Sequence, residues 1–555
     1  MSPAPATLMA VLLASAVSGA QASTESMAAH CRQMPQMPGC EPYLAAGTRA
    51  LPALTTALPG EGMVAPKPAV ATPVVTLEDG DHYRLRAEVV SATLAGAPLR
   101  LYAYNGSVPG PLLKVRQGTT VTIDFENAID QESTVHWHGL RLDWRHDGAP
   151  DISQAPVPPG GTHRYLLRFP DEGMYWYHPH VREDFQQDAG LYGNIWVLPE
   201  DPQHYAPVDR ELALILDDLL IEDGVQVPYG KYAASHALMG RFGNLLLING
   251  KPDWRLDAGV GETARLYLTN AANARVFNLS LPGLRMKRVG GDSGRYEREE
   301  WVDELLLAPS ERAIVELAFD RPGDYPLRHS TPAGSRELGE IRVAGSSPAI
   351  AAIAADALRA TPLVQAEIAA LAPVLESAPA LILTMDVDLG GYAAAQHPSP
   401  EPGRLDSGAH AGHGTAGNAV PPIEWEDTMG TINAAASSER IRWLLRDSAS
   451  GAENAQVHWK LRQGEPVKIR LTNPATGQHP MQHPIHFHGQ RFVVAAVDGV
   501  AASNRVWKDT VLVPAGASVD IVLDPSNPGE WMAHCHIAEH LSSGMMIRFR
   551  VEAAS

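Results

Sequence analysis

Cysteine is scarce in this sequence, which has three among its 555 residues. An odd number excludes complete disulfide pairing within the chain. Cys31 and Cys40 lie close together and could close a small disulfide loop in an exported protein, an interpretation that we prefer to a metal site. Cys535 is then left unpaired between His534 and His536, and a thiol in such company suggests a metal ligand.

Basic residues are also few. The chain has 44 Lys and Arg against 63 Asp and Glu, and its formal net charge is −19. DNA and RNA favour proteins that neutralise phosphates with basic side chains. The charge balance therefore argues against a nucleic-acid partner and mildly favours cationic ones.

Long apolar runs are absent after residue 22, where no stretch reaches the roughly 18 residues that a membrane-spanning helix needs. We therefore expect no membrane span. The first residues do carry an apolar run, 7–19, followed by the small-residue cleavage pattern Ala20-Gln21-Ala22. This pattern predicts a signal peptide over 1–22 and export to the periplasm or the medium. The usual basic residues before the run are missing, so a misassigned start codon or a frayed terminus is the alternative.

What the sequence does contain is an ordinary globular composition, with 45% hydrophobic and 19% charged residues. This composition argues against wholesale disorder. A length of 555 residues exceeds one ordinary core and predicts three or four domains. Because 48 glycines and 45 prolines favour short strands joined by turns over long helices, we predict an all-β protein.

Two blocks of sequence recur three times along the chain. The first block ends an alternating run at an asparagine nine positions after a glycine, at 118–127, 261–270 and 464–473. The second leads from a proline through a strand pattern to a turn glycine, at 159–173, 309–323 and 514–529. The repeats predict three homologous β-domains. We place them at 73–200, 205–346 and 380–555, with an N-terminal extension over 23–72, a partly helical linker over 347–379, and a mobile loop over 397–422.

Four His-x-His pairs occur among the 22 histidines, where roughly one would arise by chance. Side chains i and i+2 of a strand point to the same face, so the eight imidazoles could converge on shared metal ions. Two pairs lie in the first predicted domain and two in the third. The middle domain has none, so we predict that it is a spacer that binds no metal. The pairs are His136/His138, His178/His180, His486/His488 and His534/His536.

The thiol of Cys535 should point away from its two flanking histidines and could serve a second metal. Further candidate ligands are His483, His540 and Met545. Two imidazoles, a thiolate and a weak thioether form the ligand set of a blue-copper electron-transfer centre. Zinc fits badly. Structural zinc prefers four closed nitrogen or sulfur ligands, and one thiolate with so many imidazoles would require several separate zinc sites of no obvious use. Buried histidines satisfied by hydrogen bonds are the alternative for any single residue.

These motifs resemble those of the multicopper oxidases, the family of laccases, ascorbate oxidase, bilirubin oxidase, ferroxidases and cuprous oxidases. Four motifs carry the resemblance, which spans residues 75–555: HWHG from His136, HPH from His178, HPIHFHG from His483 and HCHIAEHLSSGMM from His534. It implies three cupredoxin-like Greek-key β-sandwich domains with a short helical linker. It also implies four copper ions, namely one type 1, one type 2 and a type 3 pair, with a trinuclear cluster between domains 1 and 3.

The resemblance implies a role for each ligand. Type 1 copper would be bound by His483, Cys535 and His540, with Met545 preferred to Met546 as the axial ligand because of the family spacing. Type 2 copper would be bound by His136 and His486. The type 3 pair would be bound by His138, His178, His180, His488, His534 and His536.

The implied reaction takes single electrons from a donor at the type 1 copper and reduces dioxygen to two waters at the cluster. Cys535 and its neighbouring histidines would relay the electrons. Asp147, eleven residues after His136, matches the family position of a carboxylate that assists oxygen reduction, although an ordinary Asp-Gly turn is the alternative. Many bacterial relatives carry a glutamate directly after the last type 1 histidine. Here that residue is Leu541, which leaves Glu539 as an unproven substitute.

The electron donor could be organic, such as a phenol, or a metal ion. We predict a laccase-like oxidase, with a Cu(I) oxidase of copper tolerance as the alternative and a copper carrier as a weaker one. Met481, two residues before His483, favours Cu(I) because thioethers select this ion. Yet His479 stands where cuprous oxidases carry an aspartate, and their Met-rich segment is replaced by a loop with histidines at 397, 410 and 413.

Overall fold

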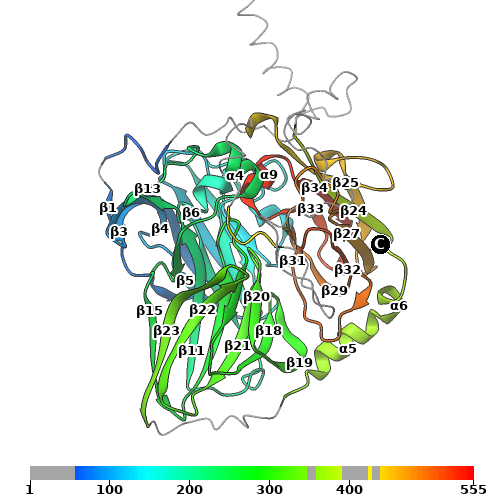
Figure 1. Cartoon of the computed structure of the whole chain (residues 1–555). Coiled ribbons are helices and arrows are strands. Elements are labelled where there is room, and N and C mark those ends of the chain that lie inside the picture. Colours follow the sequence, from blue (N-terminus) through cyan, green and yellow to red (C-terminus); the bar gives the residue numbers. More distant parts are fainter. Residues whose placement is uncertain (1–56, 65, 347–357, 390–422, 428–437, 555) are drawn as a thin grey trace, which may run out of the picture. The chain divides into compact units, whose positions relative to one another are not determined.

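A computed structural model describes residues 57–64, 66–346, 358–389, 423–427 and 438–554. The chain divides into two compact units, 1–50 and 51–555, and all described residues belong to the second. The predicted signal peptide, Cys31, Cys40 and the histidine-containing loop lie outside the described residues. Strands dominate the described part (Figure 1), which confirms the predicted all-β class. None of its helices has the length and apolar character to cross a bilayer.

The first sandwich consists of two sheets from the first third of the described chain. Its strands are β1 (Lys67–Pro68), β2 (Val74–Thr76), β3 (His82–Leu94), β4 (Ala97–Tyr104), β5 (Leu112–Arg116), β6 (Thr120–Asn127), β7 (His136–His138), β8 (Thr162–Arg168), β9 (Gly173–His178) and β10 (Gly193–Leu198). One sheet has the order β1-β3-β6-β8, with β4 paired to β3, and the other has the order β2-β5-β10-β9-β7. Alternate residues of β6 are buried, so Val121, Ile123 and Phe125 face the core between the sheets.

The middle sandwich repeats this design. Its strands are β11 (Arg210–Leu219), β12 (Ile221–Glu222), β13 (Val225–Gln226), β14 (Leu245–Ile248), β15 (Trp254–Val260), β16 (Thr263–Asn270), β17 (Phe277–Ser280), β18 (Met286–Gly291), β19 (Gly294–Val302), β20 (Glu304–Leu307), β21 (Arg312–Ala318), β22 (Gly323–Thr331) and β23 (Gly334–Ser346). The two large sheets have the orders β14-β11-β16-β21-β18-β19 and β15-β23-β22-β17-β20. They enclose their own apolar core.

The third sandwich contains the C-terminal strands. They are β24 (Leu381–Asp388), β25 (Arg442–Asp447), β26 (His458–Arg462), β27 (Val467–Thr472), β28 (His483–Phe487), β29 (Arg491–Val497), β30 (Val500–Ala501), β31 (Thr510–Val513), β32 (Ser518–Asp524), β33 (Gly529–Cys535) and β34 (Met546–Glu552). The sheet orders are β25-β24-β27-β32-β29-β30 and β26-β34-β33-β28-β31. The strands of the three sandwiches follow the predicted domains, except that β1 lies in the predicted extension. The exact boundaries stay a prediction.

The triplicated sequence blocks occupy equivalent places in the three sandwiches. The asparagine that ends each block is buried and donates from its side-chain amide to two backbone carbonyls. The glycine that opens each block has a φ between +79° and +95°, which glycine adopts at little cost. The asparagines are Asn127, Asn270 and Asn473, and the glycines are Gly118, Gly261 and Gly464.

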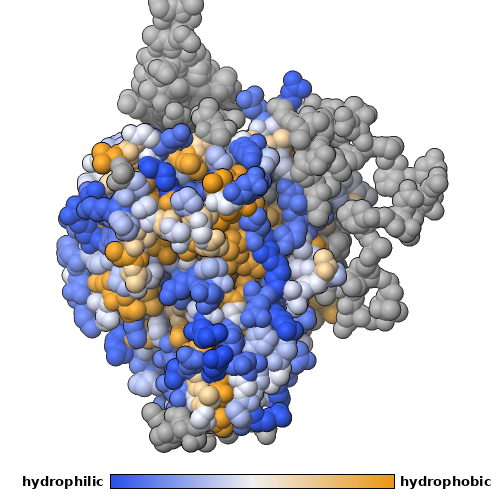
Figure 2. Space-filling view, turned by 60° about the vertical axis from the view of Figure 1, so that its left-hand side comes forward, coloured by the Kyte–Doolittle hydropathy of each residue, from blue (hydrophilic) through white to orange (hydrophobic). Residues whose placement is uncertain are grey.

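Short helices join and flank the sandwiches. α5 (Pro362–Ala370) and α6 (Ala372–Leu375) fall within the predicted linker, and Glu367 of α5 accepts a hydrogen bond from Trp507 Nε1 at 2.6 Å. α9 (Ala538–Ser542) contacts both α3 (Glu183–Gln186) and α4 (Ala233–Met239). The remaining short helices are η1 (Trp144–His146), η2 (Ser438–Arg440) and η3 (Asn454–Gln456). On the face shown in Figure 2, hydrophobic residues lie among hydrophilic ones.

Candidate metal centres

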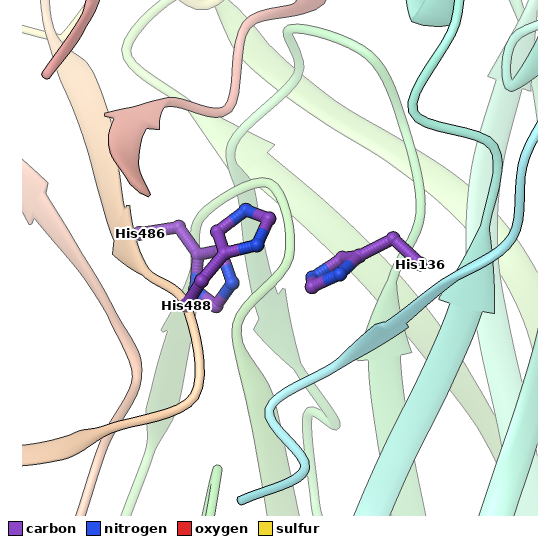
Figure 3. A group of neighbouring side chains, drawn as sticks. All are labelled: His136, His486 and His488. Atoms are coloured by element: carbon purple, nitrogen blue, oxygen red, sulfur yellow. The ribbon is translucent and has the colours of Figure 1, made fainter. Parts of the chain in front are cut away.

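The four histidine pairs meet where the first sandwich contacts the third. β7 and the end of β9 carry two pairs, and the ends of β28 and β33 carry the other two. β7 pairs antiparallel with β9, so His136 lies opposite His178. Figure 3 shows His136 facing His486 and His488 from the other sandwich. The rings of His136 and His488 stack with centroids 4.0 Å apart, and those of His138 and His486 with centroids 3.7 Å apart.

Three overlapping groups of buried histidines have ligand nitrogens within 4.8 Å of one another. Two of these groups combine residues from both sandwiches, so the cluster depends on their contact. His536 completes the set, because its ring centroid lies 5.0 Å from that of His178. The structure thus brings together all eight histidines that the sequence analysis paired. The groups are His136/His486/His488, His136/His138/His178 and His180/His488/His534.

The inward nitrogens of this cluster fit metal ions. Six rings each have one buried nitrogen that lacks a hydrogen-bond partner among the described residues. The Nε2 atoms of His488 and His534 face each other at 3.0 Å. Buried polar atoms without partners are costly in a folded protein unless another ligand satisfies them. Imidazole nitrogens suit copper, so the residues fit this metal. The six atoms are Nε2 of His136, His178, His180, His486 and His536, and Nδ1 of His138.

The outward nitrogens hold the rings in place. His178 Nδ1 donates to the Pro179 carbonyl at 2.9 Å, and His180 Nδ1 lies 2.7 Å from Glu183 Oε1. Glu183 is buried at the start of α3. Burial alone would lower the pKa of His180, but the Glu183 carboxylate outweighs it and raises this pKa. Sequence reasoning missed Glu183, because a single acid after a histidine motif is not distinguishable from a surface charge.

Asp147, the predicted catalytic acid, contacts one histidine of each sandwich. Its backbone carbonyl accepts from His136 Nδ1 at 2.9 Å, and its Oδ2 accepts from His488 Nδ1 at 2.8 Å. Gly148 follows with a φ of +81°, and a Cβ there would lie 1.9 Å from the Val135 carbonyl oxygen. The Asp-Gly turn is therefore present, and it aims the carboxylate at the cluster.

Asp509 makes the same two kinds of contact from the opposite side. Its carbonyl accepts from His486 Nδ1 at 2.9 Å, and its Oδ1 accepts from His138 Nε2 at 3.0 Å. Arg312 of the middle sandwich pairs with both carboxylate oxygens. Burial would raise the pKa of Asp509, but the Arg312 guanidinium holds it well below its usual value. Neither residue was predicted from the sequence.

The second candidate centre lies inside the third sandwich. Cys535 Sγ is 3.6 Å from His483 Nδ1 and 3.6 Å from His540 Nδ1, and these two nitrogens are 3.2 Å apart. All three side chains are buried. Burial raises the pKa of the Cys535 thiol far above its usual range and lowers that of His483 to about 3. A coordinated metal ion would deprotonate the thiol, and the neutral imidazoles are ready to bind.

Met545 and Met546 point to different environments. Met545 is fully buried in the apolar core that also contains Cys535, and its amide donates to the His540 carbonyl at 3.0 Å. Met546 belongs instead to a small cluster with Ala149. Successive side chains of an extended segment point to opposite sides. The Cys535 amide donates to the Met545 carbonyl at 3.1 Å, so Met545 lies beside Cys535 along the backbone, whereas Met546 packs in the other cluster.

A helix of the middle sandwich covers this centre. His540 Nε2 donates to the carbonyl of Leu238 in α4 at 3.0 Å. Trp443 stacks on the His540 ring with centroids 4.0 Å apart and donates from Nε1 to the Ala237 carbonyl at 2.8 Å. The sequence analysis did not foresee this cover, because α4 has no motif that connects it to His540.

The other residues singled out from the sequence lie near the two centres. Glu539 is buried in α9 and accepts from Asn273 Nδ2 at 3.0 Å, and burial raises its pKa well above the usual range. Met481 is fully buried. His479 Nε2 lies 3.1 Å from the sulfur of Met239, the last residue of α4.

His329, in β22 of the middle sandwich, is not part of either centre. Its Nδ1 accepts a hydrogen bond from the Asn278 amide at 3.1 Å. Burial lowers its pKa to about 4. Within the described residues, no group with metal-ligand spacing includes it. The absence of a metal site from the middle domain stays a prediction, but α4 and Arg312 show that this sandwich contributes to both centres.

Comparisons with known proteins agree with this geometry. Family models described as multicopper oxidase match residues 87–202, 211–345 and 427–555, which together exceed half of the chain. The chain is 25% identical to the copper resistance protein A homolog of Pseudomonas syringae pv. tomato, over 85% of this chain and 92% of that protein. It is also 25% identical to Laccase-3 of Oryza sativa subsp. japonica, over 81% and 88%. The multicopper oxidase structure from Pseudomonas thermotolerans superposes with a TM-score of 0.62 at 26% identity, covering 86% of this chain and all (100%) of that one.

Three cupredoxin-like sandwiches with two buried sets of nitrogen and sulfur ligands define a copper-dependent oxidoreductase. The chain belongs to the multicopper oxidase family. Its cofactor is copper, with four ions in the type 1, type 2 and type 3 classes, and dioxygen is the electron acceptor.

Proposed function

We propose that the copper ligands have the roles that the resemblance to the multicopper oxidases implies. The set of inward imidazole nitrogens without protein partners is the observation that carries this proposal. The backbone hydrogen bond from the Cys535 amide to the Met545 carbonyl, and the burial of Met545 in the same core, support Met545 as the axial ligand. The proposed ligands are His483, Cys535, His540 and Met545 for type 1, His136 and His486 for type 2, and His138, His178, His180, His488, His534 and His536 for type 3.

Bound copper would supply single-electron transfer at the type 1 site and dioxygen reduction at the cluster. The chain supplies the path between them, because Cys535, the last residue of β33, is covalently joined to His534 before it and to His536 after it. It also supplies a group for proton transfer. Asp147 Oδ1 is buried, has no hydrogen-bond partner among the described residues and lies 3.3 Å from His136 Nδ1. A proton held at this atom would be within reach of the cluster.

We infer that the donor is a neutral phenol-like molecule that binds beside α4 and α9. The pocket there is lined from all three sandwiches by Arg182, Asp184, Tyr229, His236, Arg241 and Glu539, among others. Both of its arginines have carboxylate partners, with Arg182 2.7 Å from Asp184 and Arg241 3.1 Å from the buried Asp188, and Glu439 is an exposed carboxylate on the lining. Burial and Arg241 lower the pKa of His236 to about 3, so this imidazole is neutral. Such a wall offers hydrogen bonds to a neutral ring.

A Cu(I) donor is the second candidate. The contact between His479 and the Met239 sulfur joins two ligand types that suit Cu(I). Against this candidate, the side chains of Met239 and Met481 are both fully buried, so neither of these two thioethers is presented at the surface. Relatives named as laccase and as copper resistance protein fall on both sides of this choice.

Oxygen uptake by the copper-loaded protein tests the donor. A methoxyphenol and Cu(I) would be compared as donors, each corrected for uncatalysed oxidation. We expect rapid phenol turnover without added copper. Efficient Cu(I) turnover, with phenol oxidation appearing only after Cu(II) is added, would instead identify a metal oxidase. No uptake with either donor at full copper occupancy would favour a copper carrier.

We also propose that the protein is exported, on the basis of the apolar run 7–19 and the cleavage pattern that follows it. N-terminal sequencing of the mature protein from a cell fractionation tests this proposal. A first residue of Ser23, recovered outside the cytoplasm, is the expected result. An intact Met1 in the cytoplasmic fraction would contradict it.

A further inference from the structure

Arg312, the first residue of β21, lies completely buried where the three sandwiches meet. A guanidinium group has five N–H donors, and each one here has an acceptor. Nε donates to the Met174 carbonyl at 3.0 Å. Nη1 donates to the Ser310 carbonyl at 2.9 Å and to Asp509 Oδ1 at 2.7 Å, while Nη2 donates to the Asp292 carbonyl at 3.1 Å and to Asp509 Oδ2. The acceptors belong to all three sandwiches, so this one side chain links all three.

The Arg312 contacts continue directly into the histidine cluster. The guanidinium donates to both carboxylate oxygens of Asp509. Asp509 in turn accepts from His138 Nε2 with its Oδ1 and from His486 Nδ1 with its backbone carbonyl. Its neighbour Thr510 places a hydroxyl 3.2 Å from each of the same two nitrogens. A single residue, Asp509, therefore connects Arg312 to two imidazole rings that come from different sandwiches.

The HWHG motif is built around this ion pair. Its glycine, Gly139, has a φ of +85°, and a Cβ there would lie 2.6 Å from Asp509 Oδ2 and 2.8 Å from Arg312 Nη2. Because glycine has no side chain, the carboxylate and the guanidinium can occupy this space next to the HWHG motif. This glycine thus serves the Arg312–Asp509 pair as well as the turn.

A purely structural ion pair exists nearby for comparison. Arg265 on β16 pairs with the buried Glu316 of β21 at 2.6 Å and with Glu211 at 2.7 Å. It lies in the same sheet as Arg312 and is almost as deeply buried. Its hydrogen-bond acceptors are Glu316, Glu211 and the Ala206 carbonyl, and none of them is hydrogen-bonded to a histidine of the cluster within the described residues. It differs from Arg312 in lacking the connection through Asp509.

We propose that Arg312 of the middle sandwich is a positioning residue for the trinuclear copper cluster, acting through Asp509 on His138 and His486. The proposal rests on the ligand roles proposed above. A middle sandwich that binds no copper would then still determine how the type 2 and type 3 ligands are presented. Residues that orient metal ligands change metal affinity by about 10–100-fold when they are replaced, and we expect an effect of this size.

The test compares Arg312→Met and Arg312→Lys with the control Arg265→Met in the full chain. Copper per chain, the EPR spectrum of the type 2 copper, the ultraviolet absorption of the type 3 pair and Tm would be measured. We expect Arg312→Met to lose copper from the cluster, alter the type 2 spectrum and keep the blue absorption of the type 1 site. Arg312→Lys, which keeps the charge, should restore part of the copper. Arg265→Met should lower Tm and leave the copper content and spectra unchanged.

The proposal is overturned if Arg312→Met keeps its copper and its type 2 spectrum while losing as much Tm as Arg265→Met. Should Arg312→Met fail to fold, Arg312→Lys and Asp509→Asn decide through the same spectra, and unchanged spectra in both would overturn it. Failure of the ligand assignment looks different. In that case the unmodified protein itself would bind fewer than the expected copper ions or lack the type 2 signal.

Discussion

Asp147 and Asp509 approach the histidine cluster from opposite sides with matching contacts, but their surroundings differ. Each accepts from one histidine of its own sandwich with the backbone carbonyl and from one histidine of the other sandwich with the carboxylate. Arg312 holds both carboxylate oxygens of Asp509. No arginine or lysine pairs with Asp147 among the described residues, where its ion-pair partners are His136 and His488 and its Oδ1 has no hydrogen-bond partner. The difference supports separate roles for the two aspartates. Asp509 is held as an anion by Arg312 and is suited to position ligands, whereas Asp147 has a carboxylate oxygen that no described residue binds and is suited to hold a proton.

The largest expected effect comes from removing the fixed anion. Asp509→Ala would leave the buried Arg312 guanidinium with only the more distant Asp292 carboxylate, whose Oδ1 lies 3.8 Å from Nη1, and breaking a buried ion pair costs about 3–5 kcal/mol. We expect a fall of this size in the free energy of unfolding, measured by urea denaturation, together with loss of cluster copper. Asp147→Ala provides the comparison, because it strands no buried cation. Equal losses for the two variants would show that the two aspartates are equivalent after all.

Asp147→Asn tests the opposite role. The amide keeps an oxygen for His488 Nδ1 but cannot deliver a proton as the carboxyl group does. General acid catalysis contributes about 10²–10⁴-fold, so we expect oxygen uptake to fall by at least about 10²-fold. Copper content and the type 2 spectrum should stay as in the unmodified protein. A variant with lowered copper and undiminished turnover per copper would instead assign Asp147 to positioning.

Gly139→Ala tests the space behind His138. The new Cβ would press on Asp509 and Arg312, and overpacking a core typically costs about 1–3 kcal/mol. Gly118→Ala is the matched control, because Gly118 has nearly the same φ, +87°, and nothing within 4 Å of the position of the new Cβ. The Tm of both variants would be measured by thermal unfolding. Both replacements strain the backbone, so the difference between their Tm values reports the clash with Asp509 and Arg312. We expect only Gly139→Ala to alter the type 2 spectrum, and identical behaviour of the two would contradict this role of the motif.

The ligands could be predicted from the sequence because their signal is local. Alternation with period two places both histidines of a pair on one face, and Cys535 sits within a short motif. Repeated blocks likewise revealed three sandwiches, because each block ends in the same asparagine contact. Asp147 was found through the family motif, and its geometry then explained the turn at Gly148.

The supporting residues left no such signal. His138 and Asp509 are separated by 371 positions, and Arg312 and Asp509 by 197. A buried arginine at the start of a strand and an aspartate before another strand are unremarkable in sequence, since their meaning arises only when three sandwiches pack together. The same reason hid α4, whose contact with His540 joins residues 302 positions apart. Ligands follow from local periodicity, whereas their supports depend on tertiary contacts.

His236→Gln is expected to have the smallest effect and leaves both aspartates untouched. The side chain lines the pocket beside α4 and α9, so losing its hydrogen bond to a neutral donor should cost about 0.5–1.5 kcal/mol of donor binding. Steady-state oxygen uptake should show a higher KM for a methoxyphenol, an unchanged kcat and an unchanged rate with Cu(I). His458→Gln, on β26 with an exposed side chain, is the control. A changed type 2 spectrum or an unaltered phenol KM in His236→Gln would show that the donor does not bind in the pocket beside α4 and α9. The donor site would then have to be sought elsewhere, away from this pocket and from the cluster that the two aspartates contact.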